Sequence, residues 1–141
     1  VYFYYNKIDS ISYRSIGNIT NIDTLRADSL NIDVFEGAGD IDLDINVDKL
    51  FCAIHNGTAD INLAGFAGVS YVYSASFGLI DNSNLSCSHI YANNRSSNNI
   101  FLNANNTLEV IIENIGDIYY RGDPVNIQLN KLGSGNLIKM N

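Results

Sequence analysis

The chain has 141 residues, nearly half of them apolar, so we expect one domain over residues 1–141 with a buried core. Its formal net charge of −7, with eight Lys and Arg against fifteen Asp and Glu, excludes binding to nucleic-acid phosphates or to anionic membrane surfaces. No apolar stretch approaches the roughly 18 residues of a membrane-spanning helix.

The first fourteen residues differ from those that follow. Residues 1–5 read Val-Tyr-Phe-Tyr-Tyr, so segment 1–14 is predicted to be an aromatic N-terminal cap or a strand paired with the first coil. The chain begins at Val1 without an initiator Met, and we expect that a leader or a longer N-terminal part has been removed.

From residue 15 to residue 141 a short motif recurs every 18 to 22 residues. A turn-forming residue, usually Asp or Asn, runs directly into Ile or Leu. A period of this size over most of a chain marks a solenoid, in which one unit stacks on copies of itself. The seven pairs are Asn18-Ile19, Asp40-Ile41, Asp60-Ile61, Leu79-Ile80, Asn99-Ile100, Asp117-Ile118 and Asn136-Leu137.

Each repeat is predicted to hold two short strands joined by a Gly, Asp or Asn turn. Apolar and polar residues alternate through 30–34 and 41–47, the period of a half-buried strand. Stacked coils would place each repeating Ile about 4.8 Å above the Ile of the previous coil. Few strong helix formers occur, so we predict an all-β, parallel solenoid of about seven coils. An antiparallel meander is the alternative, but it gives no reason for constant coil length.

Two features of the sequence concern the interior of the solenoid. Residues 82–106 are dense in Asn and Ser, so this part holds stacked Asn ladders or is the loosest part of the solenoid. Cys52 and Cys87 fall at different phases of the repeat, so buried thiols are expected, with a single disulfide as the alternative.

Three groups of residues could carry chemistry, and each has a simpler structural explanation. The Asp column of Asp40, Asp60 and Asp117 could serve a glycosidase or lyase, but Asn replaces Asp in other repeats, as expected for turn hydrogen bonding. Asp40, Asp42 and Asp44 alternate along a strand and could bind calcium, yet alternate residues on the exposed face of a strand are usually just solvated. His55 and His89 share no zinc-site spacing. We therefore predict no catalytic residue, no metal and no cofactor.

Tyrosines in strand segments are the feature that suggests ligand contact, because stacked tyrosines can bind sugars or proteins. Strand alternation places Tyr71, Tyr73 and Tyr120 inward, and Tyr91 and Tyr119 outward. The predicted interaction surface comprises Tyr91, Tyr119, Asn93, Asn94 and Arg95.

The C-terminal third carries a family resemblance. Gly116-Asp117-Ile118, Tyr120-Arg121-Gly122-Asp123-Pro124 and Gly133-Ser134-Gly135-Asn136-Leu137 are similar to the turns and ending of the putative auto-transporter adhesin, head GIN domain family of bacterial secreted proteins. Earlier turns at 37–41 and 57–61 match too, so the resemblance covers about residues 25 to 141. It also gives Gly122 and Pro124 a turn role, although Arg121-Gly122-Asp123 spells a tripeptide that some integrins read.

The resemblance implies a right-handed β-helix that is exported to the periplasm, outer membrane or cell exterior. It further implies a non-enzymatic adhesion or interaction module, with a host or bacterial surface protein or glycan as partner. A carbohydrate-active β-helix enzyme, a polysaccharide-binding domain and a purely structural envelope domain are the alternatives. A homo-oligomer is also expected to be feasible, because the strand edges at the solenoid ends are open.

Overall fold

A computed structural model describes residues 2–140, and all of its regular secondary structure is β. One ten-stranded sheet contains every strand. The strands are β1 (Ser10–Ser15), β2 (Ile19–Thr20), β3 (Leu25–Gly37), β4 (Asp40–Ile54), β5 (Asp60–Ser74), β6 (Ile80–Asn94), β7 (Ile100–Ile112), β8 (Ile118–Arg121), β9 (Asn126–Lys131) and β10 (Leu137–Lys139).

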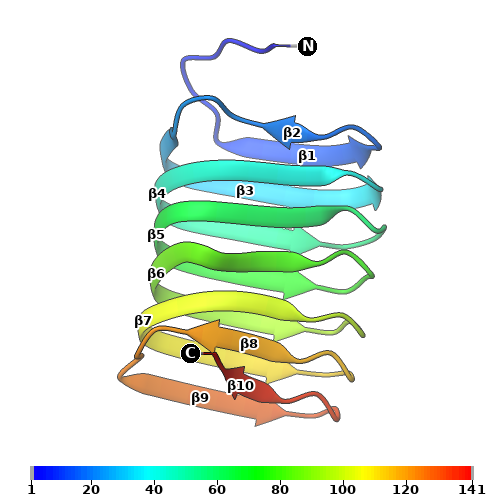
Figure 1. The fold of residues 1–141 in the computed structure, drawn as a ribbon, viewed down its shortest axis with the longest axis vertical. Helices are drawn as coiled ribbons and strands as arrows, with labels where there is room; N and C mark the ends of the chain where they lie inside the picture. The colour runs from blue at the N-terminus through cyan, green and yellow to red at the C-terminus, as the bar shows by residue number, and fades with distance from the viewer. Residues whose placement is uncertain (1, 141) are drawn as a thin grey trace.

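The strands stack in parallel as a β-solenoid of about six turns (Figure 1). Each turn runs along one face, bends at a corner and returns along the opposite face. The continuous sheet thus has two faces, called here the front sheet and the back sheet. The front sheet consists of β2, β8, β10, the start of β3 and the first halves of β4 to β7; the back sheet consists of β1, β9, the rest of β3 and the second halves of β4 to β7. Parallel pairing throughout confirms the predicted solenoid and excludes a meander.

The repeating Ile residues form one continuous column in the front sheet. Each pairs with its counterpart in the next coil, from Ile19 with Ile41 to Ile118 with Leu137. The members within the stack are fully buried, whereas Ile19 and Leu137 at its ends are half-buried. The sequence period therefore predicted the core column correctly.

The strands differ from the prediction in length. Instead of two short strands per coil, each of the middle coils has one strand of 13 to 15 residues that bends at the corner. In β4 the pairing with β5 holds at Val47 and resumes at Lys49, on either side of the corner residue Asp48. Because neighbouring coils bend at the same position, the hydrogen-bond ladder continues around the corner.

The aromatic start of the chain does not form a strand, whereas residues 10–14 of segment 1–14 lie in β1, which pairs with β3. Residues 2–9 have no regular structure, and the first strand begins only at Ser10. Tyr2, Phe3 and Tyr4 are among the most exposed side chains, whereas Tyr13 in β1 is buried. Val1 lies outside the described residues.

The two cysteines are buried free thiols, as expected. Burial raises the pKa of both Cys52 and Cys87 to about 12. Neither thiol therefore supplies a thiolate nucleophile at neutral pH.

Candidate functional site

A row of aromatic rings runs up the outer surface of the back sheet. Phe51, Tyr71 and Tyr91 pair with one another in register in β4, β5 and β6. Their ring centroids are 4.9 Å apart for Phe51 and Tyr71, and 5.4 Å apart for Tyr71 and Tyr91, with nearly parallel planes. These separations are typical of offset stacking, in which each ring overlaps its neighbour only partly. Phe51 and Tyr71 remain 42% and 41% exposed.

The register explains why these rings point outward. On either side of the row, the buried columns containing Leu50 and Cys52 take the inward positions. A strand alternates its side chains between two faces, so the residue between two inward positions faces solvent. The aromatic row is therefore set by the neighbouring buried columns.

The row forms the floor of a shallow groove of about 630 Å³ that runs along the back sheet. Its lining is mainly apolar, with carboxylate and amide groups along the strands. No Lys or Arg lines it among the described residues. The polar and aromatic lining residues are Asp33, Phe51, Tyr71, Tyr73, Tyr91, Asn93, Glu109, Gln128 and Asn130.

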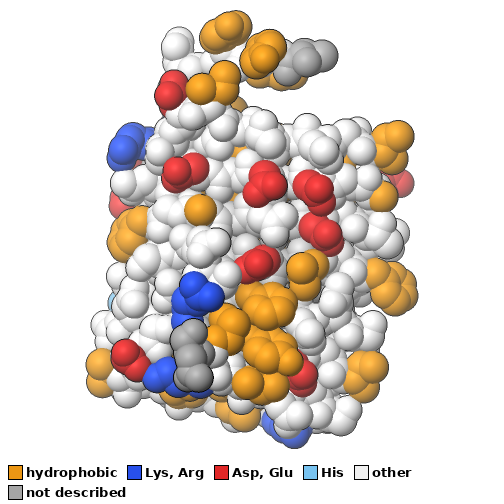
Figure 2. All heavy atoms as spheres, viewed as in Figure 1, with side chains coloured by type: hydrophobic (Ala, Val, Ile, Leu, Met, Phe, Trp, Pro, Cys, Tyr) orange, Lys and Arg blue, Asp and Glu red, His pale blue; other side chains and the backbone are white. Residues whose placement is uncertain are grey.

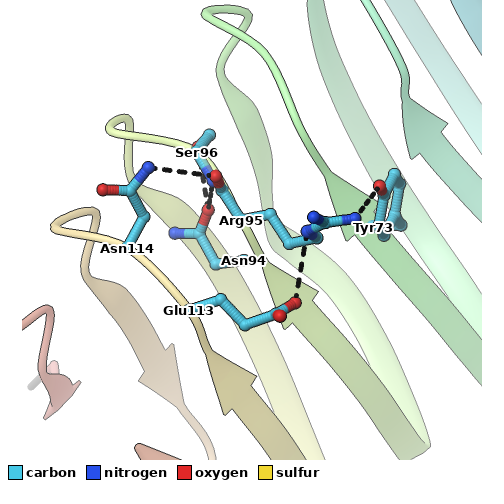
Figure 3. A network of polar contacts seen from close by, with 6 residues as sticks. All are labelled: Tyr73, Asn94, Arg95, Ser96, Glu113 and Asn114. Carbon is cyan, nitrogen blue, oxygen red and sulfur yellow. Dashed lines mark hydrogen bonds and ion pairs between the residues drawn. The ribbon is translucent and has the colours of Figure 1, made fainter. Parts of the chain in front are cut away.

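A network of polar contacts lies at the edge of this groove, where the strands end and their turns begin (Figure 3). The Arg95 guanidinium donates to the Tyr73 hydroxyl at 3.4 Å and pairs with the Glu113 carboxylate at 3.4 Å. His55 lies 2.9 Å from Asp33 and stacks on Phe35 with a centroid distance of 4.9 Å. Arg95 and His55 thus restrain Tyr73 and Asp33, side chains that line the groove.

The structure brings together three of the five residues predicted as an interaction surface. Tyr91 and Asn93 line the groove, and Arg95 lies at its edge. Tyr119 lies on the front sheet instead, where it stacks on Phe101 at 5.0 Å. Asn94 is fully buried and therefore cannot contact a partner.

Asn94 faces inward and organises the turn that follows β6 (Figure 3). Its side-chain amide donates to the Asn98 carbonyl at 2.9 Å. Its side-chain oxygen accepts from the Ser96 backbone amide at 3.0 Å and from the Ser96 hydroxyl at 2.8 Å. The Asn- and Ser-rich stretch thus contains a buried hydrogen-bond network within the turn.

Sequence reasoning missed the middle of the groove. Tyr71 and Tyr73 were predicted to face inward, but Tyr71 is exposed and both line the groove. The prediction was wrong because Ser70 and Ser74 occupy inward positions, which made the alternating tyrosines resemble the apolar face. The constant spacing of Leu30, Leu50, Ser70 and Ile90 was the signal that could have given the correct phase.

The Asp and Asn column connects successive coils. The side-chain oxygen of Asn18 accepts from the Asp40 amide at 2.9 Å, and that of Asp60 accepts from the Leu79 amide at 2.7 Å. In the same way, the side-chain oxygen of Asn99 accepts from the Asp117 amide at 3.0 Å, and that of Asp117 accepts from the Asn136 amide at 2.7 Å. These contacts support the turn interpretation of the column.

The front sheet carries acidic residues over its upper half (Figure 2). Asp42, Asp44 and Asp81 line a shallow depression there, and the Asp81 carboxylate accepts from the Ser83 amide and hydroxyl. Within residues 2–140, no group of three or more His, Cys, Asp or Glu side chains has an arrangement that could hold a metal ion.

The Arg121-Gly122-Asp123 tripeptide also has a structural explanation. Gly122 has a φ of 90°, and a Cβ there would collide with the Ala104 carbonyl oxygen. Asp123 pairs with Lys139 at 2.6 Å. The turn therefore requires the glycine.

The sequence and the fold are both similar to those of known proteins. The family model described as "Putative auto-transporter adhesin, head GIN domain" matches residues 1–124, and thus ends before the Gly133 to Leu137 motif. Among solved structures, the chain is similar to a putative adhesin from Bacteroides fragilis, with 26% identity and a TM-score of 0.87. The similarity covers 94% of this chain and 60% of the other, so this chain spans less than two thirds of that protein. A search of curated proteins finds no match. The described residues include no helix long and apolar enough to cross a membrane.

Proposed function

Since the chain belongs to the putative auto-transporter adhesin, head GIN domain family, we propose that it is an exported, non-enzymatic adhesion module that binds a surface glycan through the groove of the back sheet. The observation that carries this proposal is the stacked row of Phe51, Tyr71 and Tyr91, in which Phe51 and Tyr71 are exposed and Tyr91 is half-buried. The module would act at the cell surface or in the periplasm.

The shape and chemistry of the groove suit an extended sugar chain. The apolar C–H faces of sugar rings pack on aromatic side chains, and hydroxyl groups bond to amides and carboxylates. Offset rings expose part of each face along the row. Asn93, Gln128 and Asn130 lie beside it as hydrogen-bonding partners.

The negative charge of the groove and of the whole chain limits which glycans can bind. Asp33 and Glu109 line the groove, and the whole chain has a net charge of −7. An anionic polysaccharide would be repelled by both the local and the overall field. We therefore propose an uncharged glycan as the ligand.

A glycan array on the purified chain, run beside an assay for polysaccharide cleavage, tests the proposal. We expect binding to neutral glycans without turnover. Replacement of Tyr71 by Ser should weaken binding about fivefold to thirtyfold, because about 1–2 kcal/mol of ring contact is lost. Tyr71→Phe should retain most of the affinity. Phe66→Ser is the matched control, since Phe66 is 40% exposed but lies on the front sheet.

Two results would contradict the proposal. Binding restricted to anionic glycans, or binding to neutral glycans that Tyr71→Ser leaves unchanged, would exclude the groove as the uncharged-glycan site. Turnover that is lost in Asp33→Asn or Glu109→Gln would instead favour a carbohydrate-active enzyme, because both carboxylates line the groove.

A further inference from the structure

The groove of the back sheet follows the axis of the solenoid and crosses the strands. Two parallel rows of outward side chains line it, and each row takes one residue from each of five successive coils. The first row consists of Phe51, Tyr71, Tyr91, Glu109 and Gln128, and the second row consists of Ala53, Tyr73, Asn93, Ile111 and Asn130. Between the rows, the intervening residue of each strand faces the interior, as the buried Val72, Ala92 and Val110 do.

The groove is long in one direction and narrow in the other. Along the stack, the four coil steps from Phe51 to Gln128 span about 19 Å, at about 4.8 Å per step. Across the stack, the two rows are two residues apart on one strand, or about 7 Å. Beyond the second row, the contacts of Arg95 with Tyr73 and Glu113 bound the groove on the turn side. An extended ligand therefore fits lengthwise, parallel to the aromatic row.

The spacing of the coils matches the repeat of one class of polysaccharide. In a chain of β-1,4-linked pyranoses both bonds to the neighbouring sugars are equatorial, so the chain is nearly straight. Each sugar of such a chain advances by about one coil spacing. Because the solenoid and the chain then share one repeat, each sugar meets the corresponding position of the next coil. A chain of α-1,4-linked pyranoses curves instead, and it would leave so straight a groove after a short distance.

The side chains of the two rows suit the two kinds of surface on such a sugar. Each pyranose carries C–H groups on its faces and hydroxyl groups at its edges. The aromatic part of the first row supplies apolar contact, while Tyr73, Asn93 and Asn130 in the second row supply hydrogen-bonding groups opposite it. The Arg95 guanidinium contacts the Tyr73 hydroxyl at 3.4 Å, so this part of the groove is ordered before a ligand binds.

We propose that the ligand of the groove is a linear, uncharged chain of β-1,4-linked sugars that lies along the solenoid axis with one sugar in each coil. The inference rests on the proposed glycan binding and adds to it the linkage, the shape and the direction of the chain. The described part of the groove then has five subsites, one in each coil that contributes to the two rows. The aromatic subsites bind C–H surface, and those at Glu109 and Gln128 bind hydroxyl groups.

Isothermal titration calorimetry with cello-oligosaccharides and manno-oligosaccharides of two to six sugars tests the linkage and the number of subsites. Both series are uncharged and β-1,4-linked. The affinity of the tighter-binding series should rise at least about tenfold from two to five sugars, because each added sugar reaches another coil. Malto-oligosaccharides of the same length, which are α-1,4-linked, should bind at least about tenfold more weakly than that series.

Two substitutions four coil steps apart test the direction of the chain. Phe51→Ser and Gln128→Ala should each weaken binding of the five-sugar probe at least about threefold, because a chain along the axis contacts both positions. A chain that crossed the groove within one coil would contact at most one of them. Asn126→Ala is the matched control, since Asn126 is exposed on the same strand as Gln128 but does not line the groove, and it should leave the affinity unchanged.

Three results would overturn the inference while leaving glycan binding itself in place. They are an affinity that does not rise beyond two sugars, malto-oligosaccharides that bind as tightly as the β-1,4-linked series, and a loss of affinity in only one of Phe51→Ser and Gln128→Ala. Each variant should retain its far-ultraviolet circular dichroism spectrum, so that a lost affinity does not reflect unfolding. Absence of binding to every neutral glycan would instead contradict the proposed function on which the inference rests.

Discussion

Asn94 shows how a single polar residue can be part of the core. The inward column that contains Val34, Ile54 and Ile112 also contains two buried polar residues, Ser74 and Asn94. The amide and carbonyl groups of the Asn94 side chain are satisfied within the turn by Asn98 and Ser96. A buried polar side chain with its bonds made costs little, but removing it leaves its former partners without bonds.

Replacing Asn94 by Ala should therefore destabilise the fold markedly. The Ser96 amide and the Asn98 carbonyl would lose buried partners, and a small cavity would form, at a combined cost of about 2–4 kcal/mol. Asn93→Ala is the matched control, because Asn93 is adjacent in β6 and faces outward; it should stay within about 0.5 kcal/mol. Urea unfolding followed by circular dichroism gives both values, and equal losses would contradict the buried network.

At the level of the coil, hydrophobic period and turn chemistry predicted the core column and the parallel stacking. They did not predict the groove, because it depends on outward side chains from several coils and on the phase of each strand. The segment from Ser70 to Ser74 shows the difficulty. Its side chains do alternate between the two faces, but serines occupy two of the inward positions, so residue type alone does not show which face is inward. The network of Arg95, Tyr73 and Glu113 joins three coils, and no local pattern encodes it.

The turn column allows a prediction about Asp60. Its side-chain oxygen accepts from the Leu79 amide of the next coil, and Asn18 and Asn99 make the same contact in other coils. Asp60→Asn should thus change the free energy of unfolding by less than about 0.5 kcal/mol, whereas Asp60→Ala should cost about 1–2 kcal/mol. Chemical denaturation of both variants measures the difference. Equal costs would mean that the carboxylate charge, and not the hydrogen-bond acceptor, is what the turn requires.

The whole molecule is a one-dimensional stack, so its stability is distributed by position along the axis. Each middle coil is paired on both sides, for example β5 between β4 and β6. Among the described strands β9 pairs with β7 alone, and all six of its residues are exposed. In such a stack the local free energy of opening is lowest where a strand is paired on one side only.

Amide hydrogen exchange followed by mass spectrometry should reveal this gradient in dilute solution. We expect peptides from β4, β5 and β6 to exchange slowest, through nearly global unfolding, and peptides from β9 and β10 to exchange at least about a hundredfold faster, which corresponds to about 2.7 kcal/mol less protection. Uniform protection of all coils would contradict the stack picture and indicate a single cooperative unit.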